Sequence, residues 1–269
     1  MATKFDTTPE KEAGVLTFFH RQLTFTPSPV LDVDLSGQTA IVTRSNVGVS
    51  LECSCQLLDL GLSKLILAVR DEAKGHTAAA DLDYDSVVAF ADRANKSLPT
   101  LDILIMNAAL IPFTFALNPR TKHEEGFQVT HLSTALLTLL LLPVAASKRP
   151  RQKRPTRITL GSTEGAAMST FTERGAVPLL PAFDAPVLAA VVPADKDIVV
   201  LNAASPGMCH DTQLARGIDD TLAGKLAKTL VTRRMGYTAA VGSRNVVDAA
   251  VNHGGESHGR YFSGQKIRP

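Results

Sequence analysis

The chain has 269 residues, of which 45% are hydrophobic and 20% charged, a composition that suits one large or two small globular domains and excludes a disordered tail. Its net charge of +2 is too small for a protein that binds nucleic acid through the phosphate backbone, so no nucleic-acid partner is expected. The three cysteines are odd in number and lack metal-ligand spacing, so we expect no metal site and no disulfide framework, as in a reducing compartment.

Residues 1–35 show no sustained apolar periodicity and carry Thr24-Phe-Thr-Pro-Ser-Pro29, so we expect an N-terminal arm that leads into a single domain over residues 36–269. The first residues mix acidic and basic side chains, unlike a secretory leader, which favours a cytoplasmic location. The most apolar run, residues 135–146, is shorter than the roughly 20 residues that span a bilayer, so no membrane span is expected.

Short apolar runs alternate with helical patterns from residue 39 onwards, which is typical of α/β proteins. The runs are continuous rather than alternating with polar residues, which indicates strands covered on both faces and therefore a mostly parallel sheet. Between the first two runs, residues 51–60 place apolar side chains on one helical face and stop at Gly61, which completes one βαβ unit. The predicted strands are Thr39–Thr43, Lys64–Val69, Leu101–Met106, Arg157–Leu160, Asp197–Leu201 and Arg260–Ser263.

The first predicted strand runs directly into the segment Thr43-Arg-Ser-Asn-Val-Gly-Val-Ser50 and then into a helix. A turn at this place aims backbone N–H groups and the positive end of the helix at a pyrophosphate. Only one of the glycines expected in such a turn is present, so this segment alone is a weak indication. The residues expected to contact the cofactor here are Arg44, Ser45, Asn46, Val47 and Gly48.

Several segments together make the pattern specific. They are Gly37–Ser50, Gln56–Arg70, Met106-Asn-Ala-Ala109, Leu132-Ser-Thr-Ala-Leu-Leu137, Ile158-Thr-Leu-Gly-Ser-Thr163, Ala204-Ser-Pro-Gly207 and Glu256-Ser-His-Gly-Arg-Tyr261. From about residue 15 onwards, the chain resembles the short-chain dehydrogenases/reductases, and in particular the fungal members found in secondary-metabolite pathways. The resemblance implies a Rossmann-like doubly wound parallel sheet and an NADP-dependent oxidoreductase that interconverts carbonyl and alcohol groups of a small lipophilic metabolite.

The resemblance also implies roles for individual residues. In that family a Thr-Gly-x-x-x-Gly-x-Gly turn holds the dinucleotide, an Asn-Ala-Gly turn follows a later strand, and an Asn, a Ser and a Tyr-x-x-x-Lys pair carry out the hydride chemistry. On this chain Asn107 keeps the cofactor contact of the second turn, and the catalytic serine position falls on Thr163, with Ser162 beside it. Arg70 ends the second strand, where a basic residue favours NADP over NAD, and Asp81 stands for the acidic residue near the adenine.

Several positions depart from the family pattern. Arg44 and Ser50 replace the first and last glycines of the cofactor turn. Ala109 replaces the glycine of the second turn, and Thr130 replaces the helix Asn. Glycine serves in such turns for a positive φ and for close approach of the backbone to phosphate. The Arg44 side chain either binds a phosphate directly or fills its place; we favour occlusion, which leaves NADP binding weak or lost.

The Tyr-x-x-x-Lys pair is missing from the chain. None of the three tyrosines, Tyr84, Tyr237 and Tyr261, has a lysine four residues further on, the spacing that places a phenol and an ammonium on one helix face. Prolines between residues 178 and 193 leave room for no more than a turn or two of the helix that carries the pair in the family. Residues 70–101 lack an apolar strand, so one strand at the sheet edge is expected to be reduced or absent.

These shortened segments are either a true divergence or the result of a mis-spliced gene model that omits two segments. Transcript sequencing distinguishes the two, because restored segments would bring back the Tyr-x-x-x-Lys pair. Two functions stay open. The first is an NADP-dependent oxidoreductase with impaired redox chemistry. The second is a pseudo-dehydrogenase without redox activity, which works as a cyclase or isomerase or as a scaffold for a pathway protein.

The helix expected over residues 132–144 is rich in leucine. Without the Tyr-bearing helix, one sheet face cannot cover all of its leucines, and uncovering two of them costs roughly 3–5 kcal/mol. We expect the exposed face to bind a second copy of the chain, a pathway protein or a lipophilic ligand. The leucines in question are Leu136, Leu139, Leu140 and Leu142. The basic run that follows, Lys148–Arg157, contains two prolines and predicts a solvated loop.

Overall fold

The computed structural model describes residues 5, 7–12, 14–69, 84–110, 114–164, 198–212 and 233–269. Within these ranges the chain forms a seven-stranded sheet in the order β2-β1-β3-β4-β5-β6-β7. The strands are β1 (Thr39–Thr43), β2 (Lys64–Ala68), β3 (Ile103–Met106), β4 (Thr156–Gly161), β5 (Val199–Ala204), β6 (Tyr261–Ser263) and β7 (Lys266–Arg268). All neighbouring strands are parallel except β6 and β7, which form an antiparallel hairpin.

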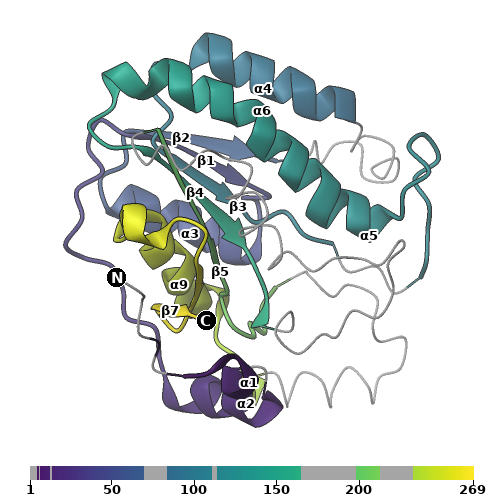
Figure 1. Ribbon diagram of the computed structural model, residues 1–269, viewed down its shortest axis with the longest axis vertical. Coiled ribbons are helices and arrows are strands. Elements are labelled where there is room, and N and C mark those ends of the chain that lie inside the picture. The colour runs from purple at the N-terminus through teal and green to yellow at the C-terminus, as the bar shows by residue number, and fades with distance from the viewer. Residues whose placement is uncertain are drawn as a thin grey trace.

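The helices are α1 (Pro9–Glu12), α2 (Val15–Thr24), α3 (Gly48–Asp59), α4 (Tyr84–Ser97), α5 (Glu125–Phe127), α6 (Ser133–Lys148) and α9 (Ala239–Val251). Helices α4 and α6 cover one face of the sheet and α3 and α9 the other, whereas α1 and α2 lie together away from both faces (Figure 1). On one face, α4 and α6 share a buried core with Ile41 and Leu104, and on the other, α3 and α9 share one with Val42 and Ile105. Successive strand residues point to opposite faces, so the continuous apolar runs supply both cores, and the predicted doubly wound fold is confirmed.

All six predicted strands are present, and β1 has the predicted bounds. Strand β7 was not predicted because it has three residues, too few for an apolar pattern; it pairs with β6 through a tight turn in which Gly264 and Gln265 both have positive φ. Helix α2 was also missed. Its Val15, Phe18 and Phe19 stand at helical spacing, a short pattern that the prediction of an arm over residues 1–35 overlooks. Its buried residue is the polar Gln22.

Two predictions fall outside the described ranges. The loss of the crossover helix concerns residues 165–197, and the loss of an edge strand concerns residues 70–83, which also include Arg70 and Asp81. Among the described strands, β2 has a single neighbour, β1, and therefore lies at the edge of the sheet. Both losses stay predictions.

The apolar helix is longer than predicted. It runs without a break over 27 residues, Glu125–Arg151, through α5, a π-helical turn (Gln128–Leu132), α6 and a 3-10 turn (Arg149–Arg151). In the described part of the chain, this is the one helix that is long and apolar enough by composition to cross a membrane. Two of its own residues, Leu137 and Leu141, nevertheless pack into the core between the helix and the sheet, as in the central helix of a globular domain.

Helix α6 is better covered than its sequence predicts. Helix α4 lies along it (Figure 1), and Phe90 of α4 belongs to the same apolar cluster as Leu140 and Leu142. Of the four leucines that one sheet face was not expected to cover completely, Leu140 and Leu142 are therefore partly buried with the help of α4. Leu139 remains 40% exposed. The solvent-exposed surface of the helix is therefore smaller than a surface that includes all four leucines.

We expect Leu141→Ala to lower the free energy of unfolding by about 2–5 kcal/mol, because it opens a cavity at a site that is fully buried. Leu139→Ala, two residues away on the exposed side, should cost less than about 1 kcal/mol. Urea denaturation of the two variants and of the unchanged chain measures the difference. Equal losses in both variants would contradict the placement of α6.

Candidate functional site

One side chain joins the carboxyl ends of β1 and β3. The hydroxyl of Thr43, at the end of β1, accepts hydrogen bonds from the backbone N–H groups of Asn107 (2.9 Å) and Ala108 (3.1 Å), which follow β3. The two turns predicted to contact a dinucleotide are therefore held side by side. Their place, just beyond the carboxyl ends of neighbouring parallel strands, is where ligands bind in open α/β sheets.

Arg44 adopts a backbone conformation that favours glycine. Its φ is +53°, in the left-handed region, which costs a residue with a β-carbon about 1–2 kcal/mol. Its N–H donates to the carbonyl of Ala68 in β2 (2.8 Å), and its Nη1 donates to the carbonyl of Ala109. Arg44 thus has the left-handed backbone conformation expected of the glycine that it replaces, and its side chain contacts the neighbouring turn at Ala109.

The N-terminus of α3 has the backbone that a phosphate group requires. The helix begins at Gly48, whose φ is +61°, and its N-cap residue, Val47, makes no side-chain capping hydrogen bond. The first N–H groups of the helix therefore have no capping side chain and carry the positive end of the helix dipole. Thr212, from the segment after β5, lies 3.5 Å from the point that a β-carbon on Gly48 would occupy. The backbone at this turn fits a phosphate.

Ser50, which replaces the last glycine of the turn, fixes the side chain of Asn107. Its buried hydroxyl accepts a hydrogen bond from Nδ2 of Asn107 (2.9 Å). Gly161, at the end of β4, lies against the same amide, because a β-carbon there would be 2.1 Å from Oδ1 of Asn107. Asn107 is therefore held between β1, α3 and β4.

The structure brings together all the predicted cofactor contacts of the first turn and Asn107 of the second. Ser45 is fully buried and its hydroxyl has no hydrogen-bond partner within the described ranges, whereas Asn46 is exposed. Thr130, in the π-helical turn, holds the same region: its hydroxyl accepts from the N–H of Leu110 (3.0 Å) and donates to its carbonyl (3.2 Å). Within the described ranges, no group of three or more His, Cys, Asp or Glu side chains is placed to bind a metal ion.

Ser162 and Thr163 follow β4 at the same edge of the sheet. The N–H of Ser162 donates to the carbonyl of Ala204 in β5 (2.9 Å), which continues the strand register by one residue. The side chain is 9% exposed, and its hydroxyl has no hydrogen-bond partner among the residues that the structure describes. A hydroxyl in this position is able to donate to the oxygen of a ligand.

Glu164, the next residue, anchors a buried ion network that the sequence did not reveal. Its carboxylate accepts from Nη2 of Arg21 in α2 (2.8 Å) and from the hydroxyl of Ser263 in β6. Arg21 also pairs with Glu12 of α1 (2.7 Å). Burial opposes the charge on Arg21, but the hydrogen bond and charge of Glu164, together with Glu12, outweigh it, so the pKa of Arg21 is raised above its ordinary value. This network fastens α1 and α2 beside Ser162.

No tyrosine has the lowered pKa that suits a general acid or base near neutral pH. All three lie in described parts of the chain. Burial raises the pKa of Tyr84, which bonds His123 (2.9 Å), and it raises the pKa of Tyr237 to about 12, with the charge of Glu164 adding to the effect. Burial, again with Glu164, also raises the pKa of Tyr261 in β6. A neighbouring ammonium would have the opposite effect.

We expect Arg21→Met to lower the free energy of unfolding by about 3–5 kcal/mol, because it leaves two buried carboxylates without their cation. The matched control is Arg120→Met, which removes an ion pair with Asp85 whose side chains are 60% and 87% exposed; it should cost less than about 1 kcal/mol. Chemical denaturation measures both. A loss at Arg21 no larger than the loss at Arg120 would contradict the network.

No family model matches the chain. Among curated proteins it is 38% identical to "Short-chain dehydrogenase fogG" of Aspergillus ruber, over 100% of this chain and 89% of the relative. It is 34% identical to "Short chain dehydrogenase/reductase mfmJ" of Annulohypoxylon moriforme, over 94% of this chain and 83% of the relative. The first alignment has 313 positions against 269 residues here, so 44 positions fall opposite gaps in this chain.

Two solved structures share the fold. The NADP complex of RhlG from Pseudomonas aeruginosa has a TM-score of 0.60 and 19% identity, over 85% of this chain and 95% of that one. The NADPH complex of L-sorbose reductase from Gluconobacter frateurii has a TM-score of 0.61 and 18% identity, over 86% of this chain and 96% of that one. Given its identity to the curated relatives over its whole length, the chain belongs to the short-chain dehydrogenases/reductases.

Proposed function

We propose that this protein is a short-chain dehydrogenase/reductase of a secondary-metabolite pathway, built to bind NADP(H) and a small lipophilic carbonyl or alcohol compound, with weakened cofactor binding and impaired proton transfer. The observation that carries the proposal is Arg44, which has the backbone of the family's glycine and a guanidinium on the carbonyl of Ala109. The three cysteines of the protein are free thiols, which suit the reducing conditions of a cytoplasmic location.

The weak cofactor binding follows from competition for one turn. The N-terminus of α3 suits the pyrophosphate, and Arg70 supports the choice of NADP over NAD. The Arg44 guanidinium must leave the Ala109 carbonyl before a pyrophosphate approaches this turn. A hydrogen bond to a charged group is worth about 1.5–3 kcal/mol, or roughly 10–100-fold in affinity, so we propose a dissociation constant for NADPH above about 100 μM.

The impaired chemistry follows from the missing proton donor. When bound, the nicotinamide supplies or accepts the hydride. Ser162 and Thr163 are the residues that would hold the substrate oxygen, but the chain has no Tyr-x-x-x-Lys pair to exchange the proton. A positioned acid or base contributes about 10²–10⁴-fold to a rate, and we propose that turnover is slower by this factor than in relatives that have the pair.

A second candidate is a pseudo-dehydrogenase that binds the same kind of metabolite without hydride transfer, as a cyclase or isomerase or as a scaffold. The raised pKa of all three tyrosines favours it, because none of them is set up to act as the acid. For the scaffold role, the surface that we propose is the side of α6 around Leu139, which would meet a second copy or a pathway protein.

We expect Arg44→Gly to tighten NADPH binding by at least about 10-fold, because it clears the turn and suits the positive φ. Ser50→Gly should have a smaller effect, since its hydroxyl bonds Asn107. Fluorescence of NADPH itself measures both, because the chain has no tryptophan. Weaker binding in Arg44→Gly would mean that the arginine holds a phosphate directly and would refute occlusion.

Turnover distinguishes the two candidate functions. With saturating NADPH and a panel of lipophilic ketones, we expect slow oxidation of NADPH that a Ser162→Ala, Thr163→Val double variant abolishes. No oxidation, together with conversion of substrate at constant NADPH, would support the non-redox function. Turnover as fast as that of a relative with the Tyr-x-x-x-Lys pair would contradict both.

A further inference from the structure

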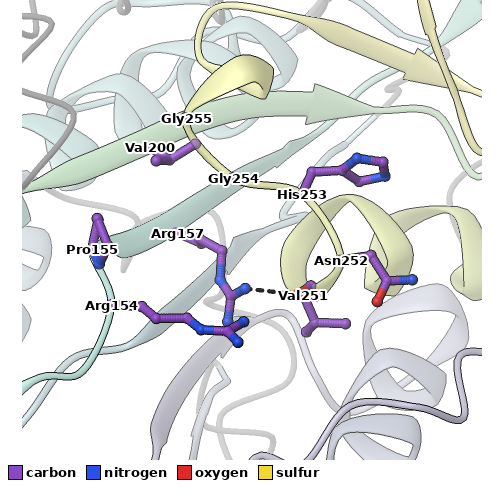
Figure 2. Close-up of a pocket in the computed structure, with 9 residues that line it drawn as sticks. All are labelled: Arg154, Pro155, Arg157, Val200, Val251, Asn252, His253, Gly254 and Gly255. Atoms are coloured by element: carbon purple, nitrogen blue, oxygen red, sulfur yellow. Dashed lines mark hydrogen bonds between the residues drawn. The ribbon is translucent and has the colours of Figure 1, made fainter.

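A cavity of about 220 Å³ lies at the end of the sheet opposite to the candidate site. It opens between the amino ends of β4 and β5 and the carboxyl end of α9 (Figure 2). Its walls include Arg154 and Arg157 on one side and His253 on the other. Both arginines belong to the basic run 148–157, which the proposed function does not use.

Arg157 is a buried cation with no carboxylate partner among the residues that the structure describes. It is 5% exposed, and its Nη1 donates to the carbonyl of Val251, the last residue of α9 (2.7 Å). This single bond caps the helix, since the last carbonyls of a helix lack partners within it. A guanidinium has several further N–H donors, and Nε of Arg157 is buried with no hydrogen-bond partner.

Nearby acidic groups are already engaged elsewhere. Asp102 attracts Arg157, but its carboxylate accepts from the N–H of Thr39 (2.8 Å) and from Gln152 (3.2 Å). Asp248 and Glu256 do not line the cavity: Asp248 pairs with His253 of the far wall (3.0 Å), and Glu256 accepts from the N–H of Gly254 (2.8 Å). In the described part of the chain, no carboxylate is therefore in contact with the guanidinium of Arg157.

Arg154 adds a second cation to the same space. In Figure 2 the two side chains approach from different directions and their guanidinium groups lie next to each other, in keeping with the effect of the Arg154 charge on Arg157. Arg154 is exposed and has neither a hydrogen bond nor an ion pair within the described residues. Burial, and then the charge of Arg154, lowers the pKa of Arg157 to about 10. Two cations this close repel each other unless an anion lies between them.

We propose that Arg154 and Arg157 form an oxyanion site that binds the phosphate group of a small ligand. Guanidinium groups pair with phosphate through two parallel N–H···O bonds, and the unused donors of Arg157 supply this geometry. The cavity is smaller than the pockets of drug-sized ligands, so it suits phosphate or a small phosphorylated compound and not a dinucleotide. The carbonyl end of α9 opposes the anion, and we expect affinity in the millimolar range.

The test is a titration of the full chain with inorganic phosphate at constant ionic strength, followed by calorimetry and by the melting temperature. We expect millimolar binding that Arg154→Gln weakens at least 10-fold, because the exposed Arg154 is removed without disturbing the core. The control is Arg151→Gln, the same charge change at an exposed residue of the preceding turn, which should alter binding less than 2-fold.

Two results would overturn the site. One is phosphate that stabilises the chain no more than chloride does at equal ionic strength. The other is Arg151→Gln weakening binding as much as Arg154→Gln, which would indicate nonspecific attraction to the basic run. A parallel titration with glycerol phosphate identifies the source of the group: tighter binding than inorganic phosphate supports a phosphorylated metabolite, and equal binding supports the free ion.

Discussion

The arrangement of the candidate site depends on the hydroxyl of Thr43. This hydroxyl accepts hydrogen bonds from two backbone N–H groups of the turn after β3, and it thereby fixes that turn against the end of β1. Asn107 is then held by Ser50 and Gly161, and the carbonyl of Ala109 is held where the Arg44 guanidinium reaches it. The two glycine replacements therefore act together: Ser50 fixes one side chain of the turn, and Arg44 covers its carbonyl.

Two arginines lie at opposite ends of the sheet, Arg21 partly buried and Arg157 buried, and they show how differently the same side chain is used. Arg21, beside Ser162, lies between two carboxylates and fastens the N-terminal helices to the domain. Arg157, at the amino ends of the strands, has one main-chain carbonyl and no ion pair within the described residues. A buried cation is tolerated when it is paired, so the first completes the fold, whereas the second calls for an anion from outside.

The sheet and its two cores were predictable because each strand is a continuous apolar run bounded by turn residues, and such runs bury both faces. The site was only partly predictable. Arg21 and Glu164 are 143 residues apart, and neither stands in an apolar pattern. The sequence around each residue therefore gives no indication that the two are in contact. The left-handed backbone of Arg44 also could not be derived from its own residue type, which disfavours it; the bond to Ala109 comes from another strand.

A crystal structure with NADPH at saturating concentration tests the central claim, that the Arg44 guanidinium and a pyrophosphate compete for the turn after β1. We predict that wherever the pyrophosphate lies at the N-terminus of α3, the guanidinium has left the carbonyl of Ala109 and points to solvent. A pyrophosphate in that place with Arg44 still bonded to Ala109, or with Arg44 bonded to the phosphate itself, would contradict the account.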